Sequence, residues 1–373
     1  MKSNRDGNRE ILRRLFGRDM DNGDHDKDNS DWDMDNGDHD KDNSDWDMDN
    51  GGWSMSRLSP RASALGQSPS AGGRRVVTLG WHPDPPDHRD ICLMRPSPPK
   101  LGRVIPGNKK AGKREAKCLA RVATHAPGVL NRTRLPNDHY CNIAHCSPVE
   151  DQGQIGSCTA QAVVGLMEYI MRHHGDDHID GSRLFLYKVT RQLMGLTGDT
   201  GAYLRTAIKA AAAIGVPPER YWEYDVSRYD DEPSPFVYTY ATNFKALDYA
   251  RLDAAWLPAQ DLLALLKRTL AEGHCIVFGF TVFSSLSNKP DIPFPGEQDE
   301  VGGGHAVMAV GFDDNRKNVG TPNKGALLIR NSWGASWGVE GYGFLPYDYV
   351  YAGLARDFWV CFAWDWLETV DGE

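Results

Sequence analysis

The sequence predicts an α+β fold with two lobes, because its helix patterns come before its strand patterns. Three segments between residues 157 and 273 have helical periodicity, and three apolar segments between 275 and 333 have the composition of buried strands. The chain has 373 residues and is 40% hydrophobic, which is enough for a substantial core. A change of composition near Leu135 separates this globular part from a long N-terminal region.

The first predicted helix has apolar residues on one face. They recur at intervals of three or four, at Ala160, Val163, Val164, Met167 and Met171. Ser157 is placed to cap the start of this helix and Gly175 to end it. Two more helices are predicted at 202–215 and 261–273, and each closes on a glycine.

The predicted strands occupy 275–283, 305–313 and 326–333, which are rich in Val, Ile, Leu and Phe. His305 begins the second strand after a run of glycines, so we expect its ring to emerge at the end of a sheet. Asn331 lies near the end of the third strand, where a neighbouring strand would place its amide beside that ring.

Residues 1–53 are expected to be disordered. A 14-residue unit, DMDNGDHDKDNSDW, fills 19–32 and repeats without change at 33–46. The stretch 19–49 holds fourteen Asp and two Lys. Its own negative charge is larger than the formal net charge of the whole chain, −9, so the rest of the chain is slightly basic. A segment this polar cannot bury a core. Its alternating aspartates resemble the ligand spacing of a calcium loop, but no amphipathic helices flank them, so we expect weak calcium association.

Residues 54–134 are rich in Pro, Gly, Ser and basic residues and are expected to be a linker or pro-segment. Ten Lys or Arg lie between 100 and 134, against one acidic residue. No aromatic residues are interleaved with these charges, so we expect no nucleic-acid partner. The segment 80–90, GWHPDPPDHRD, differs, because its prolines and Pro-Asp pairs predict an extended, ordered stretch.

Several classes of protein are disfavoured by the sequence. The first twenty residues lack the apolar core of a signal peptide, and no run approaches the roughly 18 apolar residues of a membrane span. We therefore expect no membrane partner, and a cytoplasmic location is favoured. Seven cysteines, an odd number without paired CxxC motifs, argue against a disulfide framework and a structural metal. We expect no metal, no cofactor and a monomer, with a C-terminal tail at 363–373.

Four polar residues suggest nucleophilic catalysis. Cys158 lies in the first turn of a predicted helix, where the helix dipole favours a thiolate. His305 would serve as the base, and Asn331 would fix the orientation of its ring. Gln152 precedes the cysteine by six residues across two glycines, so its amide and the Cys158 N–H would hold an oxyanion. Each residue alone has an ordinary structural explanation, such as a buried core thiol, and only the combination favours catalysis.

Three motifs identify a family resemblance. DQGQIGSCTAQA, GGHAVMAVGFDD and IRNSWGASWGVEGYGFLPYDY, in that order, resemble the papain-like cysteine proteases across 135–362. The GSCTA form is more similar to microbial members than to plant or lysosomal ones. The resemblance implies a papain-like two-lobed fold, with a helical left lobe, an antiparallel β-barrel-like right lobe and the active-site cleft between them.

The resemblance also implies a role for each catalytic candidate. By position, Cys158 matches the family nucleophile, His305 the general base and later acid, Asn331 the amide that orients the histidine, and Gln152 the oxyanion-hole residue. Trp333 matches the tryptophan that shields the His–Asn hydrogen bond.

The substrate site carries both matches and departures. Gly201, Gly304 and Trp333 are the expected substrate-binding residues, and Gly201 lies in GDTGAYL, which resembles the segment whose backbone pairs with an extended substrate. Ile155 and Thr159 stand where better-known members have Cys and Trp, and Gly304 stands where they have Asn or Asp. These departures remove no catalytic group.

The implied activity is that of a cysteine-type endopeptidase, which hydrolyses peptide or protein substrates through a covalent thioester acyl-enzyme. A papain-like acyl transferase and a non-catalytic peptide-binding protein on the same scaffold are the alternatives. The helical propeptide pattern of familiar members is not visible in 54–134. One hypothesis makes this region the inhibitory pro-segment of a zymogen, with GWHPDPPDHRD docked on the enzyme. Exopeptidase action stays open, and the segment 287–304 is expected to be a flexible exposed loop.

Overall fold

The computed structural model describes residues 10–16, 79–87, 90–93, 129, 138–175, 179–244 and 248–362. All of these belong to one compact unit, made of 1–19 and 77–373. The Asp-rich repeats, with their calcium prediction, lie outside the described residues, as do most of the basic segment and the tail at 363–373.

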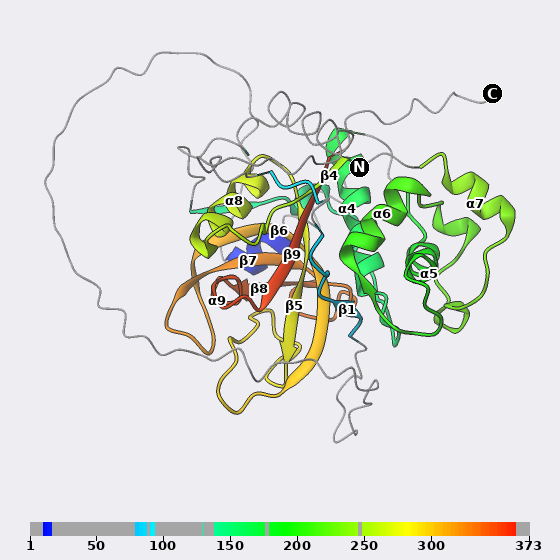
Figure 1. Ribbon diagram of the computed structural model, residues 1–373. Coiled ribbons are helices and arrows are strands. Elements are labelled where there is room, and N and C mark those ends of the chain that lie inside the picture. Colours follow the sequence, from blue (N-terminus) through cyan, green and yellow to red (C-terminus); the bar gives the residue numbers. More distant parts are fainter. Residues whose placement is uncertain are drawn as a thin grey trace, which may run out of the picture. The chain divides into compact units, whose positions relative to one another are not determined.

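The helical lobe is built around one long buried helix. Its helices are α4 (Cys158–His174), α5 (Arg183–Leu193), α6 (Leu204–Ala213) and α7 (Pro235–Ala241), with short 3-10 turns at Ile143–His145, Glu219–Tyr221 and Val226–Arg228. Helix α4 packs against α5 and α6 and also against the sheet. Figure 1 shows α5, α6 and α7 on one side of α4 and the strands on the other. Because both sides of α4 are covered, its first fourteen residues are all buried.

The sheet lobe is one open antiparallel sheet. Its strands are β2 (His139–Cys141), β4 (Asp248–Arg251), β5 (Ile276–Phe283), β6 (Val301–Lys317), β7 (Lys324–Arg330), β8 (Tyr342–Pro346) and β9 (Ala355–Phe362). The strand order is β4-β9-β5-β6-β7-β8, and β2 pairs with β6. Helices α8 (Ala259–Ala271) and α9 (Asp348–Tyr351) pack on this sheet and share its apolar core. The predicted α+β, two-lobed fold is confirmed, although the described strands do not close into a barrel.

Three local predictions differ from the structure. Strand β6 begins at Val301, so His305 lies inside a strand and not at its start. The run of glycines suggested a loop, yet its residues pair with β5. Ser157 precedes α4 but does not cap it, because its hydroxyl is engaged with Tyr224 Oη at 2.6 Å. The predicted helix at 202–215 begins two residues late, after the short strand β3 (Ala202–Tyr203).

A helix at residues 10–16 lies within the stretch that was expected to be disordered. Leu12 and Leu15 are buried, and the ring of Phe16 meets that of Phe344 on β8 edge-on at 5.8 Å. Arg14 pairs with Glu340 at 2.7 Å. This helix therefore docks on the sheet lobe before the Asp-rich repeats begin.

Residues 79–87 and 90–93, which we call the strap, run along the boundary between the two lobes. Strand β1 (Trp81–His82) pairs in parallel with β3 of the helical lobe. Further along, Ile91 and Leu93 join the core of the sheet lobe. Figure 1 shows β1, in blue, between the sheet and the helices. The ordered, extended segment predicted at 80–90 thus contacts both lobes.

The segment 287–300 is held on the sheet lobe by its backbone. The carbonyl of Ser287 accepts from Trp337 Nε1 at 3.1 Å, and that of Pro290 accepts from the Phe344 amide at 2.6 Å. Ile292 is 2% exposed, so an apolar anchor fixes the middle of the segment. The segment is therefore anchored at these points by residues distant in sequence, while residues 287–289 and 296–298 are exposed, as expected.

Candidate active site

Cys158 is the first residue of α4, at the helix end where unpaired N–H groups favour negative charge. The loop before it turns at Gly153, whose φ is 65°. At Gly156 the backbones of Gly80 and Gly201 approach so closely that a β-carbon would lie 3.2 and 3.4 Å from their Cα atoms. The glycines of the predicted nucleophile motif therefore allow other backbone segments to approach closely, and they also allow the turn.

His305 and Asn331 lie on neighbouring strands and are hydrogen-bonded. Strand β6 pairs with β7, and Asn331 directly follows β7. His305 Nε2 is 2.7 Å from Asn331 Oδ1, which also accepts the Ser332 amide at 2.8 Å. Because an amide oxygen only accepts, Nε2 carries the proton. Nδ1 is then the basic nitrogen, and it has no hydrogen-bond partner among the described residues.

Trp333 covers the histidine. Its ring stacks on that of His305 with centroids 4.4 Å apart and planes 25° apart, and Trp337 meets Trp333 edge-on at 5.7 Å. Both tryptophans are buried. Trp333 therefore lies over the His305 ring, where the resemblance places the shielding tryptophan.

Gln152 is fully buried and fixed at three atoms. Its backbone amide donates to Ser332 O at 2.8 Å, its Oε1 accepts from Ser332 Oγ at 2.7 Å, and its Nε2 donates to Ile155 O at 3.0 Å. These bonds join the loop that precedes Cys158 to the loop that carries Asn331. The four predicted catalytic residues are therefore brought together.

Burial keeps the thiol and the imidazole uncharged at neutral pH. It raises the pKa of Cys158 to about 11, although hydrogen bonds from the backbone amides of Ala306 and Gly80 lower it. Ala306 follows His305, so the thiol lies near the strand that carries the base, although no hydrogen bond joins the Cys158 thiol to His305 Nδ1. Burial also lowers the pKa of His305 to about 4, against the hydrogen bond that His305 donates to Asn331, which raises it.

The strap lies directly on these groups. The carbonyl of Gly80 accepts the Ala202 amide at 2.7 Å, beside Gly201, and the Trp81 ring packs against Gly304. Two of the three predicted substrate-binding residues, Gly201 and Gly304, therefore contact the strap. An extended backbone does pair at the GDTGAYL segment, but it belongs to the chain itself.

Buried polar groups fasten the strap. Asp84 donates its amide to Asp357 Oδ2 at 2.7 Å, and its carboxylate accepts from Trp359 Nε1 at 3.0 Å and from the Arg205 amide at 3.2 Å. Asp90 binds the Arg205 guanidinium at two points, 2.9 and 2.6 Å. Bidentate pairs of this kind are among the strongest protein hydrogen bonds.

Where the strap meets the sheet lobe, carboxylates outnumber the guanidinium groups that pair with them. Arg251 donates to Asp253 at 3.0 Å and to Asp357 at 2.7 Å. The backbone amide of Asp84, in the strap, donates to the same Asp357 carboxylate. Asp357 is 1% exposed. Burial raises the pKa of Asp357 to about 7, the charge of Asp84 adds to that rise, and Arg251 opposes it.

A family model for the papain family cysteine proteases matches residues 138–356. The chain belongs to the papain family. It is 36% identical over 219 residues to an uncharacterized peptidase C1-like protein of Acanthamoeba polyphaga mimivirus, covering 56% of this chain and 68% of that one. It is 27% identical to chymopapain of Carica papaya over 200 residues, or 52% of this chain and 50% of that one.

Among solved structures, xylellain, a cysteine protease of Xylella fastidiosa, superimposes with a TM-score of 0.59 and 30% identity. That match covers 80% of this chain and all of xylellain. The fold and the family membership of this papain-family chain therefore have support beyond its motifs.

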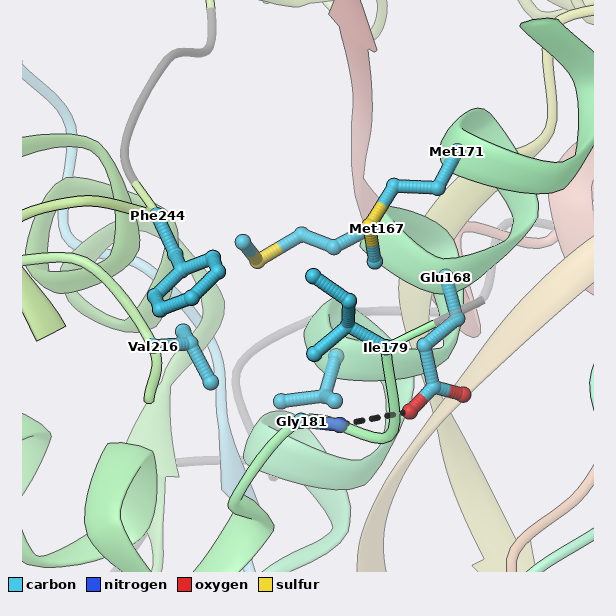
Figure 2. Close-up of a pocket in the computed structure, with 8 residues that line it drawn as sticks. Met167, Glu168, Met171, Ile179, Gly181, Val216 and Phe244 are labelled. Atoms are coloured by element: carbon cyan, nitrogen blue, oxygen red, sulfur yellow. Dashed lines mark hydrogen bonds between the residues drawn. The ribbon is translucent and has the colours of Figure 1, made fainter. Parts of the chain in front are cut away.

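A small apolar cavity lies in the helical lobe, away from the thiol. Figure 2 shows Met167, Met171, Val216 and Phe244 lining it. Met167 is about two and a half turns along α4 from Cys158. The one carboxylate at its wall, Glu168, accepts the Gly181 amide at 3.1 Å and binds a buried arginine, so its role is structural.

The described residues of this papain-family protein contain no cluster of three or more His, Cys, Asp or Glu arranged to bind a metal ion. None of their helices has the length and apolar character needed to cross a membrane.

The residues that hold the strap in place could not be recognised from the sequence. Arg205 and Asp357 carry no motif, and only the folded chain brings them to Asp84. Gly279 did carry a signal, because a lone glycine interrupts the apolar strand IVFGFTVF, and such a glycine often marks a close approach.

Proposed function

We propose that this chain is a cysteine endopeptidase that hydrolyses peptide bonds with Cys158 as nucleophile, and that the strap holds it latent. The observation that carries the catalytic part is the hydrogen bond from His305 Nε2 to Asn331, which leaves the basic Nδ1 without a hydrogen-bond partner among the described residues and available to take the thiol proton. Membership of the papain family supports the same reading.

The reaction starts once the strap has left the boundary between the lobes. His305 Nδ1 takes the proton of Cys158, and the helix terminus stabilises the thiolate. The thiolate attacks the peptide carbonyl, and the Gln152 amide with the Cys158 N–H holds the oxyanion. His305 then protonates the leaving amine, which leaves a thioester on Cys158.

Hydrolysis of the thioester completes the cycle. His305 removes a proton from water, and the hydroxide attacks the thioester carbonyl while the Cys158 sulfur leaves. Asn331 holds the imidazole in one tautomer throughout, and Trp333 keeps water from the bond between them.

Latency follows from the position of the strap. Cys158 and His305 are both fully buried, and the raised pKa of the thiol and lowered pKa of the imidazole disfavour the ion pair. The strap also occupies the backbone of β3, where the resemblance places an extended substrate.

The test uses the full chain with Trp81→Ala, which removes the largest strap side chain. Hydrolysis of a fluorogenic dipeptide amide and labelling of the thiol by an epoxide-type reagent should both increase relative to the unmodified chain. Adding Cys158→Ala should abolish both, while circular dichroism stays unchanged.

Two results would count against the proposal. Turnover that survives Cys158→Ala would remove the nucleophile assignment. Equal activity of the unmodified and Trp81→Ala chains would remove the latency assignment and leave the chemistry intact.

A further inference from the structure

Asp199 holds the loop that precedes the nucleophile, although it belongs to a different segment. Its Oδ1 accepts from the Gly156 amide at 2.8 Å and from the Tyr187 hydroxyl at 2.5 Å. Gly156 lies two residues before Cys158, and Asp199 lies 43 residues after Gly156. The cysteines that the structure describes are all free, so no disulfide among them fastens this loop. A hydrogen bond from a backbone N–H to a carboxylate is one of the stronger kinds, so Asp199 is well suited to fix the loop.

Buried groups of the helical lobe determine where the Asp199 carboxylate lies. Tyr187, on α5, is fully buried, and its hydroxyl also accepts from the Gly201 amide at 3.1 Å. The carbonyl of Gly198, the residue before Asp199, accepts from the guanidinium of Arg191, which is 1% exposed. The carboxylate is therefore presented to the loop by the packed framework of this lobe.

One peptide group connects Asp199 with the oxyanion donor Gln152. The carbonyl of Ile155 and the N–H of Gly156 belong to the same planar unit. The N–H donates to Asp199, and the carbonyl accepts from Gln152 Nε2 at 3.0 Å. A hydrogen bond from the N–H to a carboxylate polarises the peptide group, which makes its carbonyl a stronger acceptor. Asp199 therefore both orients this peptide group and strengthens its bond to Gln152.

Holding one N–H of the Gln152 amide orients the other. The side-chain nitrogen carries two hydrogens in a planar group, and the Ile155 carbonyl accepts from this nitrogen. The Oε1 of the same group accepts from Ser332 Oγ at 2.7 Å, so the amide plane is held from both ends. A donor that is aimed in advance at the developing negative charge needs no reorganisation during the reaction.

We propose that Asp199 is a positioning residue, which aims the Gln152 amide at the oxyanion through the peptide group between Ile155 and Gly156. It acts through these groups and not on the reacting atoms. The inference rests on the proposed function for the role of Gln152, but the orientation of the amide is measurable without turnover.

The first experiment observes the Gln152 amide in the full chain without other changes. With ¹⁵N-labelled glutamine, NMR gives the rate at which the Nε2 protons exchange with water, and the Gln152 signal is identified by its loss in Gln152→Ala. In Asp199→Ala we expect the proton held by the Ile155 carbonyl to exchange about tenfold faster, because its hydrogen bond is weaker.

Asp230→Ala is the matched control for this measurement. Asp230 accepts from the amide of Gly198, next to Asp199, at 2.8 Å, so it is an acidic residue that binds the same segment but not the peptide group at Gly156. The exchange rate of the Gln152 amide should stay within about twofold in this variant, since the hydrogen bonds to that peptide group are kept.

The second experiment measures the chemical consequence in the full chain carrying Trp81→Ala. The aldehyde acetyl-Phe-glycinal adds to the thiol: the Cys158 sulfur bonds to the carbonyl carbon, the π electron pair moves to the oxygen, and the thiol proton passes to His305. We expect Asp199→Ala to raise the dissociation constant of this adduct about tenfold. In alkylation by iodoacetamide the sulfur displaces iodide and no oxyanion forms, so that rate should stay within about twofold.

Two further variants separate positioning from a loss of fold. Asp199→Asn keeps an acceptor oxygen for the Gly156 amide and should bring the dissociation constant to within about threefold of that of the Trp81→Ala chain. In a chain that already carries Gln152→Ala, adding Asp199→Ala should change aldehyde binding by less than about twofold, because the group through which it acts is gone.

The outcomes separate this inference from the proposed function. An unchanged Gln152 exchange rate, equal losses of aldehyde binding and alkylation, or additive losses in the double variant would overturn the positioning role. Hydrolysis of a fluorogenic dipeptide amide by the Trp81→Ala chain tests the peptidase on its own. Hydrolysis without coupling between Asp199 and Gln152 would refute only the positioning role, and coupling without hydrolysis would refute only the peptidase.

Discussion

Asn331 determines which nitrogen of His305 is basic. Its Oδ1 accepts from Nε2 at 2.7 Å and is itself fixed by the Ser332 amide. In the Trp81→Ala chain, Asn331→Ala should lower kcat about 100-fold, since a misaligned ring costs rate more than binding. KM should change by less than about threefold, measured with a fluorogenic dipeptide amide. Asn331→Asp keeps an acceptor and should lose less, and an unchanged kcat in Asn331→Ala would argue against the orienting role.

Glu168 holds the helical lobe together through a buried ion pair. Its two oxygens each lie 2.9 Å from Arg183 Nη2, and both side chains are at most 1% exposed. Glu168→Ala should reduce the free energy of unfolding by about 3–5 kcal/mol, because the buried guanidinium of Arg183 loses its fully buried partner and keeps only more exposed carboxylates. Urea denaturation of the full chain measures this.

The same arginine supplies a control for that prediction. Asp180 also pairs with Arg183, at 2.8 Å, but it is 55% exposed. Asp180→Ala should cost less than about 1 kcal/mol. If Glu168→Ala and Asp180→Ala reduced the free energy of unfolding by similar amounts, burial would not determine how much each carboxylate contributes to stability.

Individual residues were predicted best where both the chemical role and the local structure depend on residues nearby in the sequence. Cys158 follows a turn and starts a helix, so its place is set by neighbours within ten residues. His305 was assigned to the start of a strand because glycines usually break strands, whereas here Gly304 is needed for contact with Trp81. Asp357 was invisible, since its importance comes from partners more than one hundred residues away.

Among the elements, the strap is held chiefly at Asp84. Asp84→Ala removes the acceptor for Trp359 Nε1 and the Arg205 amide. We expect thiol labelling and peptide hydrolysis at pH 7 to rise severalfold in the full chain, because the docked state loses buried charge-assisted bonds.

A second aspartate of the strap provides the comparison. Asp87 lies 3.9 Å from Lys209, whose side chain is 39% exposed. Asp87→Ala should change labelling by less than about twofold, because this ion pair is long and its lysine is largely solvated, although the Asp87 side chain is only 11% exposed. Equal activation by both substitutions would mean that general loss of acidic charge, and not the Asp84 anchor, loosens the strap.

Element prediction succeeded for several long periodic segments and missed others, among them helix α5, which has eleven residues. Helix α4 and strands β5 and β7 were found from periodicity and composition. Helix α7, seven residues long, begins with Pro235 and has only two buried residues, so its pattern is too weak to detect. Strand β9 was also missed, because ARDFWVCF is completed only by pairing with β4 and β5.

For the molecule as a whole, strap docking should depend on pH. Asp357 faces Asp84 of the strap, Asp253 and Arg251, and burial raises its pKa to about 7 in the docked state. Docking therefore favours the protonated carboxyl. The contribution of Asp357 to docking is therefore greatest below the ordinary carboxylate pKa, falls as pH rises toward 7, and levels off above it.

Thiol labelling at pH 5 to 8 tests this dependence. The ratio of labelling rates between the unmodified chain and Asp357→Asn removes the contribution of thiol ionisation. Asn mimics the protonated acid and tolerates the φ of 57° at this position. We expect the ratio to rise between pH 5 and 7 and then flatten, while a constant ratio would exclude Asp357 as the titrating group.

The strap is joined to the folded unit on both sides. Upstream, the helix at 10–16 packs on β8, and downstream the chain is buried again at Val129 before β2 begins. Cutting the peptide chain once between residues 17 and 78 would therefore leave Trp81 tethered to the protein. A tethered segment rebinds at an effective concentration in the millimolar range, so a free peptide must compete with an intramolecular rival. After a single cleavage upstream, the tethered strap should therefore still compete with substrate for the active site. The concentration of substrate would then determine the fraction of molecules in which the strap is displaced.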